Sequence, residues 1–515
     1  MSALACGPGR APAGADRHAP ARHEADWWGA LAAVALALAS LGLYLAHNDF
    51  PVWFHADEPK KARFVLEGTH DFYHPRLMIR LAEPLAALLG CRTPQQAARL
   101  GRSLVAVLGA LSVLVLYGLA RRTLPQGWAV FAAAVYALSP IQLVHAHYFK
   151  EDVPFTLFAL LALWALLRLV ERPAPVRALG LGLAAGLALG THYKGVLLAP
   201  LAALAIPLAP RGRRRGLLAL LAAALLVAGL VFLGINFAGP GTAGLDQLGR
   251  GVLADARNVV HGDRVALWPS AYYGGFHLVH SLVPGMGAPT ALAAVLAAAA
   301  LALRWRRAVA VDRLWLLWLA LSYGAIELSP FKPFPDFMRY ALPCVPALGY
   351  LLARGLALLH ARLAQWRPLR AVPVLTALVL LGLTSSMAVR DLVHMDEDTR
   401  LRARALRERL PGAAVHGHLS WAAPFASSIA EVPRERLRAL GVRWVVVSSF
   451  EYERYLIARR LPGQHPSVYA RARGFEQLFR RPYLEVRPGY RSIGFHNPTV
   501  RLIDLGAGAA EGARR

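Results

Sequence analysis

The chain has 515 residues, of which 56% are hydrophobic and only 17% are charged. Soluble domains are nearer roughly 45–50% apolar and 25% charged, so this composition excludes an ordinary soluble enzyme. The 57 Lys and Arg residues exceed the 31 Asp and Glu residues by 26, a surplus that in a soluble chain suggests nucleic acid. Many of these basic residues lie in short clusters between apolar runs, which indicates membrane topology instead. We therefore expect membrane lipids as partners, and no nucleic acid.

The apolar runs predict a polytopic, mainly α-helical membrane protein. Residues 1–26 are rich in Ala, Pro, Arg and His and are predicted to form a disordered basic tail. The run 27–46 has no small-residue cleavage site and predicts a retained membrane helix. Because a helix needs about 20 apolar residues to cross a bilayer, we expect about eleven spans. They lie near 27–46, 101–120, 127–146, 153–170, 177–192, 194–210, 216–238, 285–303, 313–329, 338–360 and 371–389.

The basic clusters predict the orientation of these spans. Arginines gather in alternate connections, and the positive-inside rule places those connections and the N-terminus in the cytoplasm. The other connections then face outward, together with everything after Arg390. We expect a multi-pass protein of the cytoplasmic (inner) membrane, with a membrane domain over 27–390 that carries an outer loop at 47–100. The outward connections are 47–100, 147–152, 191–194, 239–284 and 330–337.

Residues 391–515 are predicted to form a separate extracytoplasmic α/β domain. Leu401–Leu410 has a helical pattern and ends at Pro411-Gly412. The run VRWVVVSSF, Val442–Phe450, is rich in β-forming residues, and Thr499–Leu505 alternates like a strand. Glu451–Leu461 is predicted to be helical.

Other sequence features exclude several classes of function. Neither a P-loop, nor a GxGxxG after a strand, nor an HExxH is found in the sequence, so ATP-driven transport and zincin proteolysis lack their main support. Three cysteines are not positioned for a structural bridge. Gly182, Gly186 and Gly190 repeat every four residues in one span, which is typical of close helix packing in lipid.

Acidic residues follow the first span in the sequence HADEPKK. Asp57 and Glu58 lie beside His55 and three basic residues. An acid near a membrane face can act as a general base toward an acceptor hydroxyl or amine. The alternative is helix capping, because an acid before Pro59 is a good helix start. The residues alone leave both open.

The second outer connection, HAHYFKEDVPF, combines acids with a lysine. Lys150, Glu151 and Asp152 precede the next span. Two acids beside a lysine could hold a divalent cation or orient a phosphate. Alternatively, Asp152 caps the helix and Lys150 extends to the interface. A metal requirement is unknown, and the candidate ligands are Asp57 and Asp152.

Cations and aromatics also meet at two other outward positions. THYKG carries Lys194 between two apolar runs, and FKPFPDFMRY carries Lys332 and Arg339 before the tenth span. Such cations could neutralise a lipid phosphate. Ordinary interfacial anchoring would explain each of them separately.

Taken in order, these motifs resemble the GT-C superfamily of polytopic membrane glycosyltransferases. More narrowly, the chain resembles bacterial relatives of protein O-mannosyltransferases and of the lipid A aminoarabinose transferase. The ending GFHNPTVRLIDL is similar to the last strand of the outer domain in many such proteins. The other motifs are HADEPKKARFVLEG, His74-Pro75 with the apolar run after it, YFKEDVPFTLFALLALWALL, GLALGTHYKGVLLAP and RYALPCVPALGYLLARG.

The resemblance implies a role for each matching residue. Asp57 matches the general base of the first outer loop, with Glu58 as its catalytic neighbour. Asp152 and Glu151 match the acidic position of the second loop, which binds donor, acceptor or metal. Many relatives have Arg-Pro-Asp or Arg-x-Asp where this chain has Lys150-Glu151-Asp152. The other expected donor- or acceptor-binding residues are Lys150, Lys194, Lys332, Arg339 and His74.

The resulting hypothesis is an inverting transferase that moves a sugar from a polyprenyl-phosphate carrier to a protein, lipid or glycan acceptor on the outer membrane face. Nucleotide sugars are not available there, so the donor must arrive on a membrane-anchored carrier. A transporter or flippase of lipid-linked sugars is one alternative, although the spans contain few acids beyond Glu327. A noncatalytic envelope assembly protein is the other, and it predicts tolerance of substitutions at Asp57 and Asp152.

Overall fold

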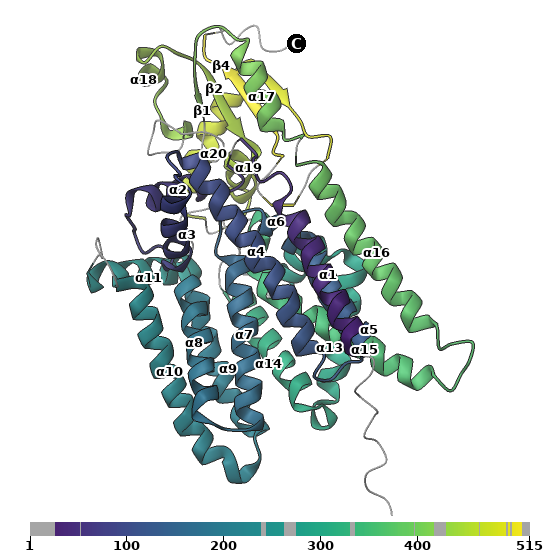
Figure 1. Ribbon diagram of the computed structural model, residues 1–515. Coiled ribbons are helices and arrows are strands. Elements are labelled where there is room, and N and C mark those ends of the chain that lie inside the picture. The colour runs from purple at the N-terminus through teal and green to yellow at the C-terminus, as the bar shows by residue number, and fades with distance from the viewer. Residues whose placement is uncertain are drawn as a thin grey trace, which may run out of the picture.

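The computed structural model shows a bundle of long helices with a small β-sheet at one end (Figure 1). We call this end of the bundle the sheet end. The basic tail predicted over residues 1–26 lies outside the described residues, except for Asp26. Lys332 also lies outside them. The structure describes residues 26–51, 53–237, 244–261, 274–329, 335–395, 397–416, 429–462, 464–490, 493–494 and 497–506.

Helices occupy all of the predicted spans, which confirms a mainly helical, multi-pass membrane protein. Within the described residues, six helices are long and apolar enough to cross a membrane, or up to eight if each of two bent pairs is one span. The number of crossings stays a prediction. The helices are α1 Asp26–Leu45, α4 Pro94–Ala120, α5 Gln126–Ala137, α6 Pro140–Ala146, α7 Asp152–Glu171, α8 Pro175–Thr191, α9 Leu198–Ala205, α10 Arg214–Phe237, α12 Val283–Met286, α13 Ala288–Leu303, α14 Ala310–Glu327, α15 Val345–Leu363 and α16 Val372–Val393.

Two predicted spans are bent helix pairs. The run 127–146 divides into α5 and α6, which meet at 58°. The break lies at Ser139, because the residue before a proline is disfavoured in the α region, and Pro140 then begins α6. The residues around 285–303 bend by 113° between 278–286 and α13. The segments predicted as 177–192 and 194–210 form apolar helices shorter than 18 residues.

Short helices at the sheet end carry the segments between spans. A short helix, α2 (Glu58–Glu67), follows α1, and α3 (Leu77–Leu88) follows it. The helix α11 (Leu245–His261) crosses the end of α10 (Figure 1). Two 3₁₀ segments complete this end: η1 (Tyr193–Leu197), after α8, and η7 (Pro335–Cys344), before α15.

The C-terminal residues form the four-stranded sheet, in the order β1-β2-β4-β3. The β1 strand is parallel to β2, and the other pairs are antiparallel. The predicted helix before Pro411 and the predicted strands within 442–450 and 499–505 are confirmed, although Ser449 and Phe450 already belong to the following helix. The elements are α17 Thr399–Glu408, β1 Ala413–His416, α18 Arg434–Ala439, β2 Val442–Ser448, α19 Ser449–Ala458, α20 Pro466–Phe479, β3 Tyr483–Val486 and β4 Val500–Asp504.

An apolar cluster joins this sheet unit to the helical bundle. Phe450 of α19 packs in one buried cluster with Phe54, which precedes α2, and with Tyr148, which precedes α7. Leu392 of α16 belongs to the same cluster. The C-terminal unit therefore rests directly on the two segments that carry the predicted acidic residues.

The glycines of α8 pack against α10, as predicted. A Cβ atom at Gly182 would lie 2.6 Å from Val227 Cβ, and one at Gly186 would lie 2.6 Å from Val231 Cβ. A Cβ atom at Gly190 would lie 2.5 Å from Ile235 Cδ1. These distances leave no space for a side chain, so the glycines allow the two helices to approach closely.

Gly186→Ala is expected to lower the thermal unfolding temperature of the purified chain in detergent, because the added methyl group overlaps α10. Gly180→Ala is the matched control on the same helix, since a Cβ atom there meets nothing within 4 Å. Alanine favours helix by about 0.5–1 kcal/mol over glycine, so the control should be neutral or stabilising. Equal melting temperatures for the two variants would contradict this packing.

Candidate functional site

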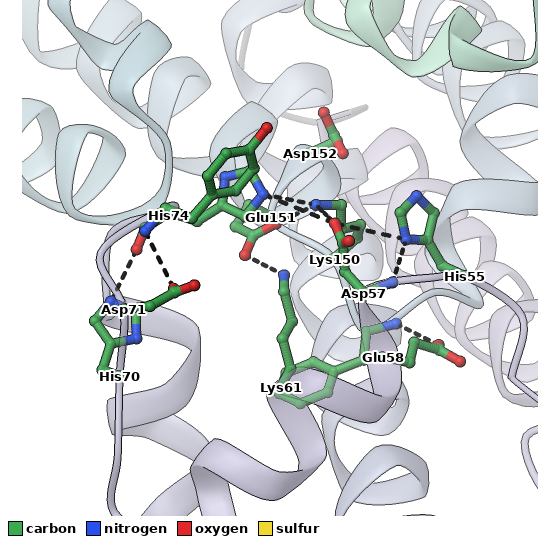
Figure 2. Close-up of polar contacts among 12 residues, drawn as sticks. His55, Asp57, Glu58, Lys61, His70, Asp71, His74, Lys150, Glu151 and Asp152 are labelled. Atoms are coloured by element: carbon green, nitrogen blue, oxygen red, sulfur yellow. Dashed lines mark hydrogen bonds and ion pairs between the residues drawn. The ribbon is translucent and has the colours of Figure 1, made fainter. Parts of the chain in front are cut away.

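The predicted acidic residues gather at the sheet end, where the start of α2 meets the connection between α6 and α7 (Figure 2). Asp57 is the N-cap residue of α2, but its side chain makes no capping hydrogen bond. The capping alternative is therefore wrong for Asp57. Its carboxylate turns instead toward the second segment, where Lys150 Nζ donates to Oδ2 at 2.5 Å.

Asp57 keeps one oxygen available. Its ion pair with Lys150 uses Oδ2, and the nearest ring nitrogens of His55 and His74, each 3.8 Å away, face the same oxygen. The side chain is 37% exposed. Burial opposes ionisation, but Lys150 and the two histidines outweigh it and hold the pKa of Asp57 well below its usual range. Asp57 is thus a carboxylate with Oδ1 open to an incoming group.

Lys150 connects the two loops. Its ammonium lies 3.0 Å from His74 Nε2 and 3.3 Å from Glu151 Oε2, in addition to its bond to Asp57. Only 3% of the side chain is exposed, so the lysine does not extend to the interface as the alternative supposed. Burial favours neutral lysine, yet Asp57 and Glu151 outweigh this effect and raise the pKa of Lys150. The group remains an ammonium.

Glu151 forms a second buried ion pair, with Lys61 of α2. Burial lowers the pKa of Lys61 to about 8, although Glu151 opposes this shift. The pKa of Glu151 falls well below its usual range, because His74, Lys150 and Lys61 outweigh burial. Glu151 is therefore ionised and paired with two lysines, so its carboxylate is not available to a substrate. Its position favours a role in holding the Lys150 ammonium in place.

Asp152 begins α7 and faces a different set of cations. Arg339 Nε lies 3.4 Å from Asp152 Oδ2, and Lys194 Nζ lies 3.9 Å from Oδ1. The N-cap of α7 is Glu151, and it makes no side-chain cap, so Asp152 does not cap the helix as the alternative supposed. Both cations also lie over the ring of Tyr340, at 4.4 Å and 5.3 Å.

Glu58 is enclosed by donors. It is fully buried, and its Oε1 accepts from Phe149 N at 2.9 Å and Arg102 Nε at 3.1 Å. Its Oε2 accepts from Phe54 N at 2.8 Å and Arg102 Nη2 at 2.7 Å. This carboxylate therefore fixes the segment before Asp57 to the segment before Lys150, and the geometry favours positioning over direct chemistry.

Three contributors were missed from the sequence. Lys61 was seen only as a neighbour of the acids, and Arg102 was not considered. Arg102, the last charged residue before the long apolar stretch of α4, was a usable signal, since charges next to apolar spans are rare and paired. Tyr340 gave no signal apart from its place beside Arg339. Lys332 lies outside the described residues.

The carboxylates do not suit a metal ion. Among the described residues, groups of three or more His, Cys, Asp or Glu that could hold a metal are not found. The two candidate ligands, Asp57 and Asp152, each face cationic side chains, which would repel a divalent ion. The donor set therefore does not fit a metal.

Comparison with known proteins shows which folds and families this chain is similar to. Residues 85–235 match the family model of dolichyl-phosphate-mannose-protein mannosyltransferase, a range that includes Lys150, Asp152 and Lys194. No curated protein matches the chain significantly.

Two solved structures share the architecture. The oligosaccharyltransferase AglB of Archaeoglobus fulgidus, in complex with an inhibitory peptide and a dolichol-phosphate, aligns with a TM-score of 0.59 at 16% identity, over 89% of this chain and 72% of AglB. ArnT of Cupriavidus metallidurans, bound to undecaprenyl phosphate, aligns with a TM-score of 0.52 at 17% identity, over 94% of this chain and 100% of ArnT. The chain therefore has the GT-C glycosyltransferase fold, which confirms the resemblance seen in the sequence.

Glu58→Gln is expected to destabilise the chain by about 3–5 kcal/mol, because it leaves the buried Arg102 charge without its partner. An amide also presents an NH₂ group to one of the two backbone donors. Glu67→Gln, at the exposed end of α2, is the matched control. Thermal unfolding in detergent measures both variants. A Glu58→Gln variant as stable as the control would show that this pair does not hold the two loops.

Proposed function

We propose that the chain is an inverting membrane glycosyltransferase that moves a sugar from a polyprenyl-phosphate carrier to an acceptor. One observation carries the proposal: a partly exposed carboxylate, Asp57, and a surplus of cations meet at one end of a multi-pass bundle with the GT-C fold. The family-model match and the fold of two glycosyltransferases support the same class.

The cations around Asp152 are suited to the donor phosphate. Lys194 and Arg339 bring two positive charges to one carboxylate. The first turn of α7 adds the positive end of a helix dipole. A phosphate bound there gains charge as the sugar leaves, and fixed cations stabilise that charge in the transition state. We assign donor binding to Lys194 and Arg339, with Asp152 orienting them, and keep Lys332 as a further candidate.

We assign to Asp57 the role of general base, which accepts the proton of the acceptor. The acceptor hydroxyl or amine attacks the anomeric carbon while its proton passes to the Asp57 carboxylate. The bond from the anomeric carbon to the phosphate oxygen breaks, and the phosphate leaves with the electron pair. A carboxylate paired with a lysine is a weak base. The donor phosphate would compete for Lys150, which weakens the pair and raises the pKa of Asp57 when substrate is bound.

The remaining residues organise this site. Lys150 holds Asp57 and His74 together, and Glu151 and Lys61 support Lys150. Glu58 is proposed as a positioning residue, because its oxygens are occupied by donors. Sugar and acceptor specificity are not assigned to any of them. The acceptor classes remain protein, lipid and glycan.

The arginine-rich connections support an orientation with the site on the outer face of the inner membrane. The ends of α4 and α7 that point away from the sheet (Figure 1) are rich in arginine: Arg121 and Arg122 follow α4, Arg168 lies in the last turn of α7, and Arg172 follows it. The positive-inside rule assigns these ends to the cytoplasm. The sheet end, with Asp57 and Lys150, then faces outward, where a lipid-linked donor is required.

Transport is the less supported reading. Glu327, an acid in an apolar span, accepts hydrogen bonds from the backbone N–H groups of Gly275, Phe276 and His277 at 2.9–3.1 Å. Asp312 pairs with Arg354 and Tyr350. Both acids are thus committed to structural partners, whereas a translocation pathway requires groups that a substrate can reach.

Asp57→Asn should reduce turnover by at least roughly 100-fold, the usual contribution of a general base. The assay incubates the purified chain with undecaprenyl-phosphate hexoses and pentoses and with acceptor membranes from cells lacking the protein. Mass spectrometry follows the release of undecaprenyl phosphate. Asp49→Asn, at an exposed position of the same loop, is the control and should retain wild-type turnover. Wild-type turnover in Asp57→Asn, or retention of the anomeric configuration in the product, would contradict the assigned step.

A further inference from the structure

A buried ion pair lies where the last membrane helix meets the C-terminal unit. Arg400, in the first turn of α17, is 1% exposed, and Asp398, the N-cap of that helix, is fully buried. Arg400 Nε donates to Asp398 Oδ1 at 2.9 Å, and Nη2 donates to Oδ2 at 2.8 Å. A fork of two bonds fixes the plane of the guanidinium.

The C-terminal loop holds this pair from one side. Asn497 N donates to Asp398 Oδ2 at 2.7 Å, and Thr399 N donates to Asn497 Oδ1 at 3.1 Å. Asn497 belongs to the HNPT sequence just before β4 and has a φ of 58°, a left-handed conformation that asparagine tolerates better than most residues. The proposed function gives this sequence motif no role.

The remaining nitrogen of the guanidinium reaches a distant segment. Arg400 Nη1 donates to the carbonyl oxygen of Trp53 at 2.6 Å, across 347 positions of the chain. The guanidinium also lies over the ring of Phe50, at 5.4 Å. Trp53 is four residues before Asp57. A helix cap requires only Asp398, so this third bond serves a purpose beyond starting α17.

The contacts continue from this segment to the site. The Phe50 ring stacks on Phe54 at 4.3 Å, and Phe54 N donates to Glu58, the neighbour of Asp57. In the other direction, the contacts lead from Arg400 through Asp398 and Asn497 to β4, which pairs with β2 in the sheet. The backbone before Asp57 is therefore fixed on one side by Glu58 and Arg102 and on the other by Arg400.

We propose that Arg400 is a positioning residue through which the C-terminal unit holds the Asp57 segment in its working geometry. The inference rests on the proposed function for its kinetic consequence only, because order in the Asp57 segment can be measured without any turnover. A displacement of about 1 Å in a reacting group can cost roughly 100-fold in rate. The fork geometry explains the choice of arginine, since the three bonds use three separate nitrogens of a planar group and the single nitrogen of lysine does not reproduce that spacing.

The test compares Arg400→Lys and Arg400→Gln with Arg404→Gln in the full chain in lipid nanodiscs. Arg404 lies on the same helix, is 54% exposed and pairs with Glu408. Hydrogen–deuterium exchange is followed in a peptide covering residues 48–66 and, as an internal reference, in peptides covering β2 and β4. Turnover and the KM for the lipid-linked donor are measured on the same preparations.

Both Arg400 variants should exchange the 48–66 amides roughly tenfold faster or more, as expected when a charge-assisted hydrogen bond is lost. The β2 and β4 amides of Arg400→Lys and every peptide of Arg404→Gln should remain as in the wild type. Turnover should fall with little change in KM. Unchanged exchange at 48–66 in both variants, or a rise at β2 and β4 that matches it in both, would overturn the proposal. Exchange could change as expected while neither the wild type nor any variant releases undecaprenyl phosphate. In that case the proposed function fails and the positioning contact stands.

Discussion

The site depends on one ammonium group held between two loops. Lys150 bonds Asp57 from the α2 side and lies beside Glu151 and His74. Removing these charges from water is costly, and the cost is offset only because each buried charge has an opposite partner at close range. The pairs therefore fix the mutual position of the two loops. A substrate phosphate would disturb this balance, which gives the site a physical reason to respond to its donor.

The surrounding fold serves to bring these charges together. The close contact of α8 with α10 and the capped start of α4 build the helical frame. Glu58 and Arg102 connect the frame to the loops, and Arg400 adds a contact from the C-terminal unit. As a result, the acids at the sheet end differ in how far solvent can reach them. Glu58 and Glu151 are enclosed, whereas Asp57 keeps access to solvent.

Much of this arrangement could be predicted from the sequence. Apolar length located the membrane helices, and the positions of Asp57, Asp152, Lys194 and Arg339 beside the spans indicated a shared site. The pairing could not be predicted, because it joins residues far apart in the chain: Lys61 and Glu151 are separated by 90 positions, and Arg102 and Glu58 by 44. Local rules also favoured helix capping for Asp57, and the distant lysine overrides them. The strands β1 and β3, with four residues each, were too short to show an alternating pattern.

The central claim is that the chain consumes a sugar carried on a polyprenyl phosphate. The most direct test is mass spectrometry of the carrier lipids from cells that lack the protein, compared with the same cells complemented with the wild-type chain. The account predicts that one polyprenyl-phosphate sugar accumulates in the deletion cells and clears on complementation, which would also identify the donor. A carrier pool that is the same in both cells would contradict it.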